Sequence, residues 1–299
     1  MVGGKKVALI TGVTGFTGKY MEMELLKAGY VVYGFTTRPS KSPMYFQVNL
    51  DNVTLMAEIF RNIQPDLILH LAAQAFVAGD DPLEFYHSNT IGTGNLFTAI
   101  ETSQVQPDSI LISSSANVYG NNGASESLTE SSIVKPVNDY AISKLAMEYV
   151  CDLWREKFPI IVTRPFNYTG LSQKENFLIP KIVRHHKSRS NSISLGNTDV
   201  YRDFCDVRDV VLAYRLLMEQ KKSINGVVNI CSEKVYSLLD ILNMCEEVTG
   251  HTLTVSVNEK FVRDNEVKLL KGSNEYLHSL INGWDPRPLK ITLKWMLSA

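Results

Sequence analysis

Three polar side chains, Ser115, Tyr140 and Lys144, have the types and the order along the chain that reduction of a ketone requires. Tyr140 and Lys144 are four residues apart, so on a helix both side chains lie on one face. A nearby ammonium group favours the phenolate and lowers the pKa of a tyrosine, which makes proton transfer feasible near neutral pH. The hydroxyl of Ser115 can bind the same substrate oxygen and hold it for that transfer. Together with a hydride from a nicotinamide, these groups would complete the reduction.

The Tyr-x-x-x-Lys spacing alone is weak evidence, because such pairs are common on exposed helices. Its weight comes from two other signals in the chain. A run of serines, residues 113–115, stands at the end of an expected strand, and a glycine-rich segment opens the chain. The three signals in this order favour a nicotinamide enzyme over an accidental surface pair.

The glycine-rich segment follows an apolar run, residues 7–10, and precedes a helical pattern. Gly12 permits a tight turn, Gly15 lets the backbone approach a phosphate, and Gly18 lets the helix pack closely on the strand. The helix N-terminus then faces a pyrophosphate. The spacing is Gly-x-x-Gly-x-x-Gly and differs from the Gly-x-Gly-x-x-Gly of the best-known dehydrogenases. The prediction of a dinucleotide site therefore depends on the position of these glycines between a strand and a helix. The cofactor contacts expected here are Gly12, Thr14, Gly15, Phe16, Thr17 and Gly18.

The end of the second strand, residues 30–36, indicates which dinucleotide binds. An NAD site usually offers Asp or Glu to the adenosine ribose at this point, and the chain has Thr37 and Arg38 instead. Arg38 can neutralise a 2′-phosphate, so NADP(H) is the expected cofactor, with NAD(H) as the alternative. Further cofactor contacts are expected at Asn49, Leu50, Leu71, Ala72, Ala73, Asn89, Tyr140, Lys144 and Pro165.

Strands and helices alternate through the first half of the chain, which predicts a Rossmann-type, doubly wound parallel α/β sheet with a smaller C-terminal substrate-binding lobe. Residues 1–165 are expected to form mainly the NADP-binding domain. Residues 166–299 are expected to form mainly a nucleotide-sugar-binding lobe, interleaved with returns to the sheet. Expected strands cover 6–11, 30–36, 47–51, 66–74, 109–113 and 160–164; expected helices cover 52–62, 82–102 and 140–157.

The helix at 140–157 has an apolar stripe broader than one sheet face requires. We therefore expect a homodimer formed through the helices at 84–102 and 140–157.

Composition excludes several other functions. Lys and Arg number 30 and Asp and Glu 31, so the net charge of −1 offers no broad footprint for nucleic acid or an anionic membrane. The four cysteines form no C-x-x-C pair, which is typical of reduced cytoplasmic thiols rather than of zinc sites or disulfides. The N-terminal apolar run is too short for a secretory signal or a membrane span. Adjacent His185 and His186 cannot share one helical face, so we expect both to be solvated and no metal to bind. These features predict a cytoplasmic enzyme with a small-molecule substrate.

Several motifs together resemble one family, the extended short-chain dehydrogenase/reductases acting on nucleotide sugars, over essentially the whole chain. Among them the chain is most similar to the GDP-4-keto-6-deoxy-D-mannose reductases that form GDP-D-rhamnose. The motifs are residues 11–18, 70–73, 113–115, 140–144, 164–167, 201–204 and 283–286.

The resemblance implies NADPH-dependent reduction of the C4 ketone of a GDP-4-keto-6-deoxy-hexose, with Ser115, Tyr140 and Lys144 as the catalytic triad. It also implies diphosphate contacts from Asn167 and Arg202, and from Arg263, which would close on the diphosphate from the C-terminal lobe. The remaining substrate contacts expected are Gln74, Ser115, Asn117, Lys181, Leu195, Gly196 and Glu266.

Departures from the family pattern narrow the reaction. Dehydratases of the family have acidic residues directly after the position of Ser115, and Ala116 and Asn117 occupy those positions here. The substrate is therefore expected to arrive already dehydrated. Alternatives are a 4-epimerase with tightly bound NAD, a reductase of another nucleotide-linked 4-keto sugar, and a non-catalytic NADP-binding regulator, which the intact triad disfavours. The face of C4 that receives the hydride stays open between D-rhamnose-type and 6-deoxy-talose-type products.

Overall fold

The computed structural model describes residues 4–74, 81–121, 127–197, 199–220, 224–258 and 267–299. The chain folds into two units. The first unit comprises residues 1–118, 136–164 and 211–228, and the second comprises residues 119–135, 165–210 and 229–299. Neither unit is one continuous stretch of sequence. The assignment of one lobe to the dinucleotide and the other to the sugar stays a prediction.

A seven-stranded sheet runs through the first unit in the order β10-β6-β5-β4-β1-β2-β3. The pairs from β6 to β3 are parallel. Residues of the inner strands are buried on both faces, as a parallel sheet covered by helices requires. The predicted Rossmann-type fold is thus confirmed. The strands are β1 (Val7–Thr11), β2 (Val31–Thr36), β3 (Tyr45–Gln47), β4 (Leu67–His70), β5 (Ser109–Ser113), β6 (Ile160–Pro165) and β10 (Gly226–Ile230).

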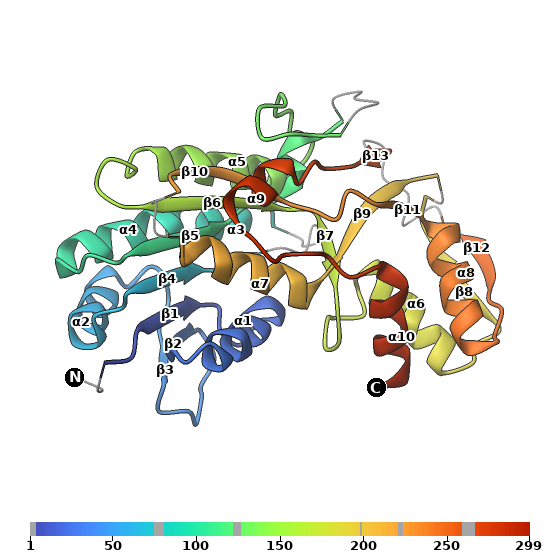
Figure 1. Ribbon diagram of the computed structural model, residues 1–299, viewed down its shortest axis with the longest axis horizontal. Helices are drawn as coiled ribbons and strands as arrows, with labels where there is room; N and C mark the ends of the chain where they lie inside the picture. Colours follow the sequence, from blue (N-terminus) through green and yellow to red (C-terminus); the bar gives the residue numbers. More distant parts are fainter. Residues whose placement is uncertain (1–3, 75–80, 122–126, 198, 221–223, 259–266) are drawn as a thin grey trace. The chain divides into compact units, whose positions relative to one another are not determined.

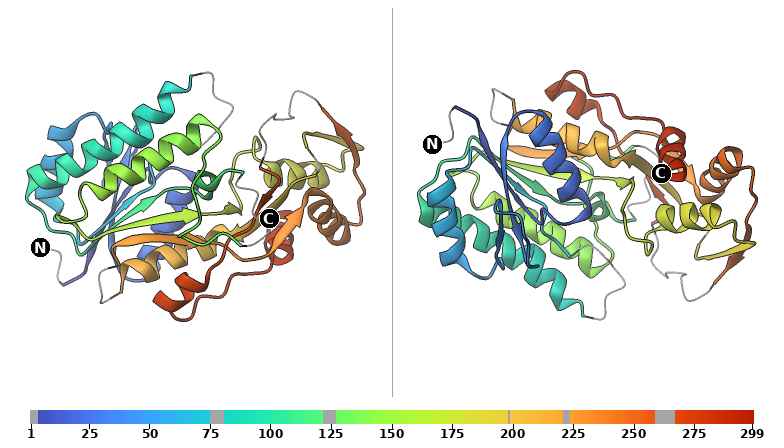
Figure 2. Two further views of the ribbon diagram at one scale, coloured as in Figure 1. Left: turned by 90° about the horizontal axis from the view of Figure 1, so that it is seen from above. Right: turned by 90° about the horizontal axis from the view of Figure 1, so that it is seen from below.

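Helices cover both faces of this sheet (Figure 1). On one face lie α2 (Val53–Ile63), α4 (Gly92–Ser103) and α5 (Asp139–Asp152), and α4 and α5 run side by side (Figure 2). On the other face lie α1 (Phe16–Lys27) and α7 (Val207–Met218), joined by a 2.8 Å ion pair between Glu24 and Arg215. The short α3 (Leu83–Phe85) and the π-helical η1 (Tyr86–Ile91) lead directly into α4.

Three expected elements have different bounds in the structure. The strand expected at 66–74 ends at His70, so residues 71–74 lie outside it. The helix expected at 140–157 ends at Asp152, because the chain turns there and buries Phe158 in the core. The rings of Trp154 and Phe158 stack on Phe97 with centroids 5.7 and 6.5 Å away. The strand expected at 47–51 lies earlier, at Tyr45–Gln47.

The second unit is built on small sheets. β9 (Tyr201–Asp206) pairs with β7 (Asn167–Thr169), β11 (Val235–Ser237) and β13 (Leu269–Leu270), and β8 (Ser192–Leu195) pairs with β12 (Thr254–Val257). Its apolar core draws on α6 (Leu178–Lys187), α8 (Leu238–Thr249) and α10 (Leu289–Ser298), and α9 (Glu275–Leu280) lies near the end of the chain.

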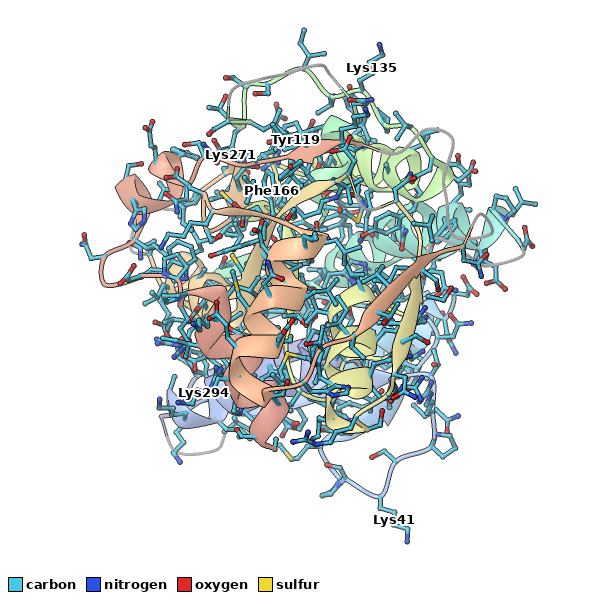
Figure 3. All side chains as sticks on the ribbon, turned by 90° about the vertical axis from the view of Figure 1, so that its right-hand side faces the viewer. Lys41, Tyr119, Lys135, Phe166, Lys271 and Lys294 are labelled. Carbon is cyan, nitrogen blue, oxygen red and sulfur yellow. The ribbon has the colours of Figure 1, made fainter. Side chains whose placement is uncertain are left out.

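Aromatic residues fill part of the same unit. The rings of Tyr119 and Phe166 lie 6.2 Å apart, and Figure 3 shows them close together while Lys135 and Lys294 point outward. Gly272 passes so close that an added Cβ would lie 2.6 Å from the Phe166 ring. A side chain at position 272 would therefore displace this aromatic pair.

The prediction of two solvated histidines is wrong for His186. Its side chain is buried on α6, its Nδ1 lies 3.2 Å from the Thr249 hydroxyl, and its ring packs edge-on against His251. The amphipathic pattern of α6 turns this histidine toward α8, a packing partner that lies far away in the sequence.

All four cysteines are buried and unpaired. Across the described ranges, no helix is long and apolar enough to cross a membrane.

Candidate active site

The tip of β5 presents three consecutive serines. Ser115 follows the strand and is 8% exposed. Its Oγ accepts a 3.2 Å hydrogen bond from the Asn117 amide, and its carbonyl accepts one from the Val118 amide, which together form the turn η2 (Ala116–Tyr119). The hydroxyl is therefore held at the end of a buried strand with its oxygen oriented by the backbone.

Helix α5 brings Tyr140 and Lys144 to this strand tip. The helix begins at the side chain of Asn138, whose Oδ1 accepts a 2.9 Å bond from the Ala141 amide. Tyr140 is 8% exposed and packs edge-on against Phe85. One turn later, Lys144 Nζ donates a 2.7 Å hydrogen bond to the carbonyl of Ser113. The structure thus ties the Tyr-x-x-x-Lys helix to the strand end that carries Ser115.

The charge on Lys144 is set by opposing effects. Burial lowers the pKa of its ammonium to about 8, while Cys151 and Glu148 act to raise it. The group therefore keeps most of its positive charge at neutral pH. Burial, together with the Lys144 charge, lowers the pKa of His70 to about 3, so that histidine is neutral. Lys144 is thus a buried cation one helical turn from Tyr140, and a positive charge near a phenol favours its phenolate.

The glycine-rich turn joins β1 to α1. Gly12 has φ +71, and a Cβ there would lie 2.9 Å from the backbone of Ala72; a Cβ at Gly18 would lie 2.3 Å from the Gly12 carbonyl. Gly15 precedes the helix and gives it no side-chain cap. A helix N-terminus of this kind suits a phosphate. Thr14, Phe16 and Thr17 are partly buried around the turn.

The end of β2 places the residues expected at the adenosine. The buried Thr36 hydroxyl lies 3.1 Å from the Thr14 hydroxyl and accepts a 3.1 Å bond from the Arg38 amide. Thr37 and Arg38 are exposed, so the guanidinium is available to an anion. After β3, Asn49 is exposed and its amide nitrogen donates to Asp51 at 3.0 Å. Asp51 is a carboxylate near this end that the sequence interpretation did not single out.

Other expected cofactor contacts lie at or after the carboxyl ends of strands of the same sheet. Leu71, Ala72 and Ala73 follow β4 directly and are partly buried. Leu50 lies against Gly92, where an added Cβ would be 2.9 Å from Leu50 Cδ1. Pro165 is buried at the end of β6.

Asn89 orients a loop. It is fully buried in η1, its Oδ1 accepts a 3.1 Å bond from the Gln74 amide, and its Nδ2 donates to Ser143 Oγ at 3.0 Å. Ser143 Oγ in turn donates to the Tyr140 carbonyl at 2.8 Å. The Asn89 side chain, expected at the cofactor from the sequence, is engaged by the protein, and this geometry supports a role in orienting the Gln74 backbone.

Sequence reasoning missed a buried chain of hydrogen bonds behind the turn. His70 Nδ1 lies 2.8 Å from the Thr11 hydroxyl, and Nε2 lies 3.0 Å from the Thr93 hydroxyl. Thr93 donates to the Asn89 carbonyl at 2.6 Å, and Thr11 Oγ1 accepts from the Ala72 amide at 3.1 Å. This chain joins β1, β4 and η1. The position of His70 in a buried strand was the only sequence signal.

The substrate residues expected from the resemblance lie mainly in the second unit. Asn167 begins β7, directly opposite Phe204 of β9, and Arg202 lies two residues earlier on β9. Arg202 NH1 donates to the Tyr201 and Lys268 carbonyls, and Lys181 Nζ donates to the Ser194 carbonyl at 2.6 Å. Leu195 ends β8 and Gly196 follows it. Gln74 and Asn117, in the first unit, are partly buried. Arg263 and Glu266 lie outside the described residues.

Comparison with known proteins decides the family. Residues 8–231 match the NAD dependent epimerase/dehydratase family. The chain belongs to this family. Its membership confirms the resemblance to extended short-chain dehydrogenase/reductases and the expectation of an NAD(P)-dependent enzyme.

Individual relatives within the family are similar over nearly their whole length. The GDP-6-deoxy-D-talose 4-dehydrogenase of Aggregatibacter actinomycetemcomitans is 36% identical over 91% of this chain and 90% of its own. The GDP-6-deoxy-D-mannose reductase of Pseudomonas aeruginosa is 31% identical over 97% of this chain and 94% of its own. The structure of RMD from Pseudomonas aeruginosa complexed with NADPH superposes with a TM-score of 0.85, at 29% identity and 98% coverage of both chains.

Proposed function

We propose that the protein reduces the C4 ketone of a GDP-4-keto-6-deoxy-hexose to the corresponding GDP-6-deoxyhexose, using NADPH. The observation that carries this proposal is the pair of relatives at 36% and 31% identity, whose names both place a redox reaction on a GDP-linked 6-deoxyhexose. The Lys144 contact to the strand tip supplies the matching geometry in this chain. Ala116 and Asn117, which offer no carboxylate beside Ser115, support a substrate that has already lost water.

The proposed cofactor site lies in the first unit. The glycine-rich turn and the N-terminus of α1 would hold the pyrophosphate, and Thr37 and Arg38 would bind the 2′-phosphate. The neighbour solved with NADPH supports this choice. When bound, the reduced nicotinamide supplies the hydride. NAD(H) is the alternative cofactor; residues 36–38 hold no carboxylate that could bind the adenosine ribose, which disfavours it.

The chain's own residues would carry the proton. Ser115 Oγ would donate a hydrogen bond to the C4 oxygen, and Tyr140 would donate its phenolic proton to that oxygen as the hydride reaches C4. The Lys144 ammonium would stabilise the phenolate that remains until solvent returns a proton. One hydride and one proton convert the ketone to the alcohol, so the reaction balances. Asn167, Arg202 and Arg263 would bind the diphosphate.

Two product configurations follow from the two relatives. Talose and mannose differ in configuration at C4, so hydride delivery to one face yields the GDP-D-rhamnose type and delivery to the other yields the 6-deoxy-talose type. Of the two products, we propose the GDP-D-rhamnose type. The higher identity to the talose enzyme is the observation that favours the second product.

We also propose a homodimer formed through α4 and α5. Ile142 and Tyr149 on α5, Leu153 directly after it, and Ile91 directly before α4 are 42% to 79% exposed, which is a large apolar content for a solvated face.

The test offers the purified protein NADPH with GDP-, UDP-, dTDP- and CDP-linked 4-keto-6-deoxy sugars and follows loss of the reduced-cofactor absorbance. Oxidation only with the GDP sugar supports the proposal, and the C4 configuration of the product then separates the two stereochemical forms. Oxidation only with another nucleotide overturns the GDP assignment. Interconversion of UDP-hexoses without net oxidation supports the 4-epimerase with bound NAD, and cofactor binding without turnover on any sugar supports a regulator.

A further inference from the structure

We propose that Ser114, Glu148 and Arg164 form a positioning network that holds the tip of β5 against α5 and thereby sets the geometry of Ser115, Tyr140 and Lys144. These three residues touch neither substrate nor cofactor in the proposed reaction. The inference rests on the proposed function, because it concerns the residues that would transfer the proton.

Hydrogen bonds join the three side chains in the interior of the first unit. Ser114 Oγ donates a 2.5 Å bond to Glu148 Oε1. Arg164 binds the same carboxylate with two donors, Nε to Oε1 at 3.0 Å and NH2 to Oε2 at 2.6 Å. The side chains of Arg164 and Glu148 are only 7% and 6% exposed. A two-donor fork of this kind fixes the carboxylate in direction as well as in position.

The network spans the three elements that build the site. Ser114 directly precedes Ser115 at the end of β5, and its amide donates a 2.7 Å bond to the Thr163 carbonyl of β6. Glu148 lies one helical turn after Lys144 on α5, and Arg164 lies next to Thr163 on β6. Among the residues named at this site, one other side-chain hydrogen bond joins the tip of β5 to α5, the bond from Lys144 to the Ser113 carbonyl.

Stability alone is a weak reason for such a group. A buried ion pair loses the hydration of both charges, and apolar side chains of similar size often stabilise a fold equally well. Two further features point to geometry. The network acts on the residue adjacent to Ser115, and proton transfer is sensitive to displacements of about 1 Å. Glu148 also places a negative charge near Lys144, where it helps the ammonium to stay charged.

Two variants and one control separate positioning from folding. Ser114→Ala removes the tie to the strand and leaves the ion pair in place. The double variant Glu148→Leu with Arg164→Met removes both charges while filling the space with apolar atoms, which avoids an unpaired buried charge. Ser103→Ala is the matched control: Ser103 is also a buried serine, whose Oγ donates to the Ile100 carbonyl at the far end of α4.

We expect Ser114→Ala and the double variant to lower kcat at least tenfold, with KM and the Kd for NADPH within twofold of the parent protein. Ser103→Ala should change kcat less than twofold at a similar loss of thermal stability. A kcat for Ser114→Ala equal to that of Ser103→Ala would overturn the proposal, and so would a fall in kcat that is matched by an equal fall in NADPH affinity.

A second measurement needs no substrate. Hydrogen exchange of the amides of Ser114, Asn117 and Val118 reports the order of the strand tip, since each donates a hydrogen bond there. If the parent protein turns over none of the offered sugars, the proposed function fails while this measurement still decides the positioning role. Faster exchange at these amides in Ser114→Ala but not in Ser103→Ala supports the network, and equal exchange in both overturns it.

Discussion

Lys144 Nζ and the Ser113 carbonyl are joined by a 2.7 Å hydrogen bond between α5 and the end of β5. The bond holds the buried Lys144 ammonium, which lies one helical turn from Tyr140. Its acceptor, Ser113, lies two residues before Ser115. The bond ties the helix that carries Tyr140 and Lys144 to the strand end that leads to Ser115, which the spacing of the two helical residues alone does not define.

Tyr140→Phe should lower kcat by about 10²-fold or more, the size of effect typical of general acid catalysis. The Kd for NADPH should stay within about twofold, because the phenol donates a proton rather than holding the dinucleotide. Stopped-flow turnover and fluorescence titration measure the two quantities. Tyr149→Phe makes the same change on an exposed tyrosine of the same helix and serves as the control. Near-normal turnover of Tyr140→Phe would show that another group donates the proton.

Arg38→Ala should reduce the preference for NADPH over NADH by about tenfold or more, since a hydrogen bond to a charged group contributes about 1.5–3 kcal/mol. The ratio of kcat/KM for the two cofactors measures the preference. Lys41→Ala is the control, because Lys41 is an exposed cation of the same loop and points away from the protein in Figure 3. The assignment is wrong if the parent protein uses both cofactors equally well.

Gly18→Ala should abolish measurable dinucleotide binding and destabilise the fold by about 1–3 kcal/mol, the usual effect of overpacking. An added Cβ would lie 2.3 Å from the Gly12 carbonyl, so the turn between β1 and α1 must shift. Gly226→Ala should be neutral, because no atom lies within 4 Å of the corresponding Cβ. Isothermal titration and chemical denaturation measure both effects. Parent-like binding by Gly18→Ala would contradict the role of this turn.

Asp203→Asn should change how stability depends on pH. Burial raises the pKa of the Asp203 carboxyl to about 6 from its usual 3.8, although Ser232 donates two hydrogen bonds to it. Between these two values the folded protein holds a proton that the unfolded chain has lost, so this group makes stability fall as pH rises from about 4 to 6. The variant should lose that contribution.

Denaturation of the parent protein and the variant at pH 4, 5, 6 and 7 provides the measurement. Burial also raises the pKa of Asp209 to about 6, so part of the slope should remain in the variant. His70 acts in the opposite sense: its pKa, lowered to about 3, makes stability fall as pH drops below about 6.5. Identical slopes for parent and variant in the 4–6 window would refute the Asp203 assignment.

Leu153→Glu combined with Ile142→Glu should yield a monomer, because two charges would enter the apolar contact that we propose through α4 and α5. Light scattering after gel filtration gives the mass of each form. Leu239→Glu alters an equally apolar, exposed position on α8 and should leave the mass unchanged. A parent protein that is already monomeric would refute the dimer.

The fold was largely predictable because local patterns carry its signals. The strand at 109–113 agrees with β5 in both bounds, Gly12 and Gly15 lie in the turn before α1, and Gly18 lies in the first turn of α1. Element ends were harder. Burial of Phe158 ends α5 at Asp152, and its stacking on Phe97 depends on a ring more than 60 positions earlier in the chain, which no local pattern reveals.

The sequence by itself determined the chemical groups and their order: a serine at a strand end, a tyrosine and lysine one helical turn apart, and glycines that admit a phosphate. Only the tertiary structure decided what surrounds them. The Lys144 bond to Ser113, the pairing of Glu148 with Arg164, and the His70 contacts to Thr11 and Thr93 join residues far apart in sequence. Such contacts depend on strand order and helix packing, because burial and hydrogen-bond geometry are set by neighbours in space rather than along the chain.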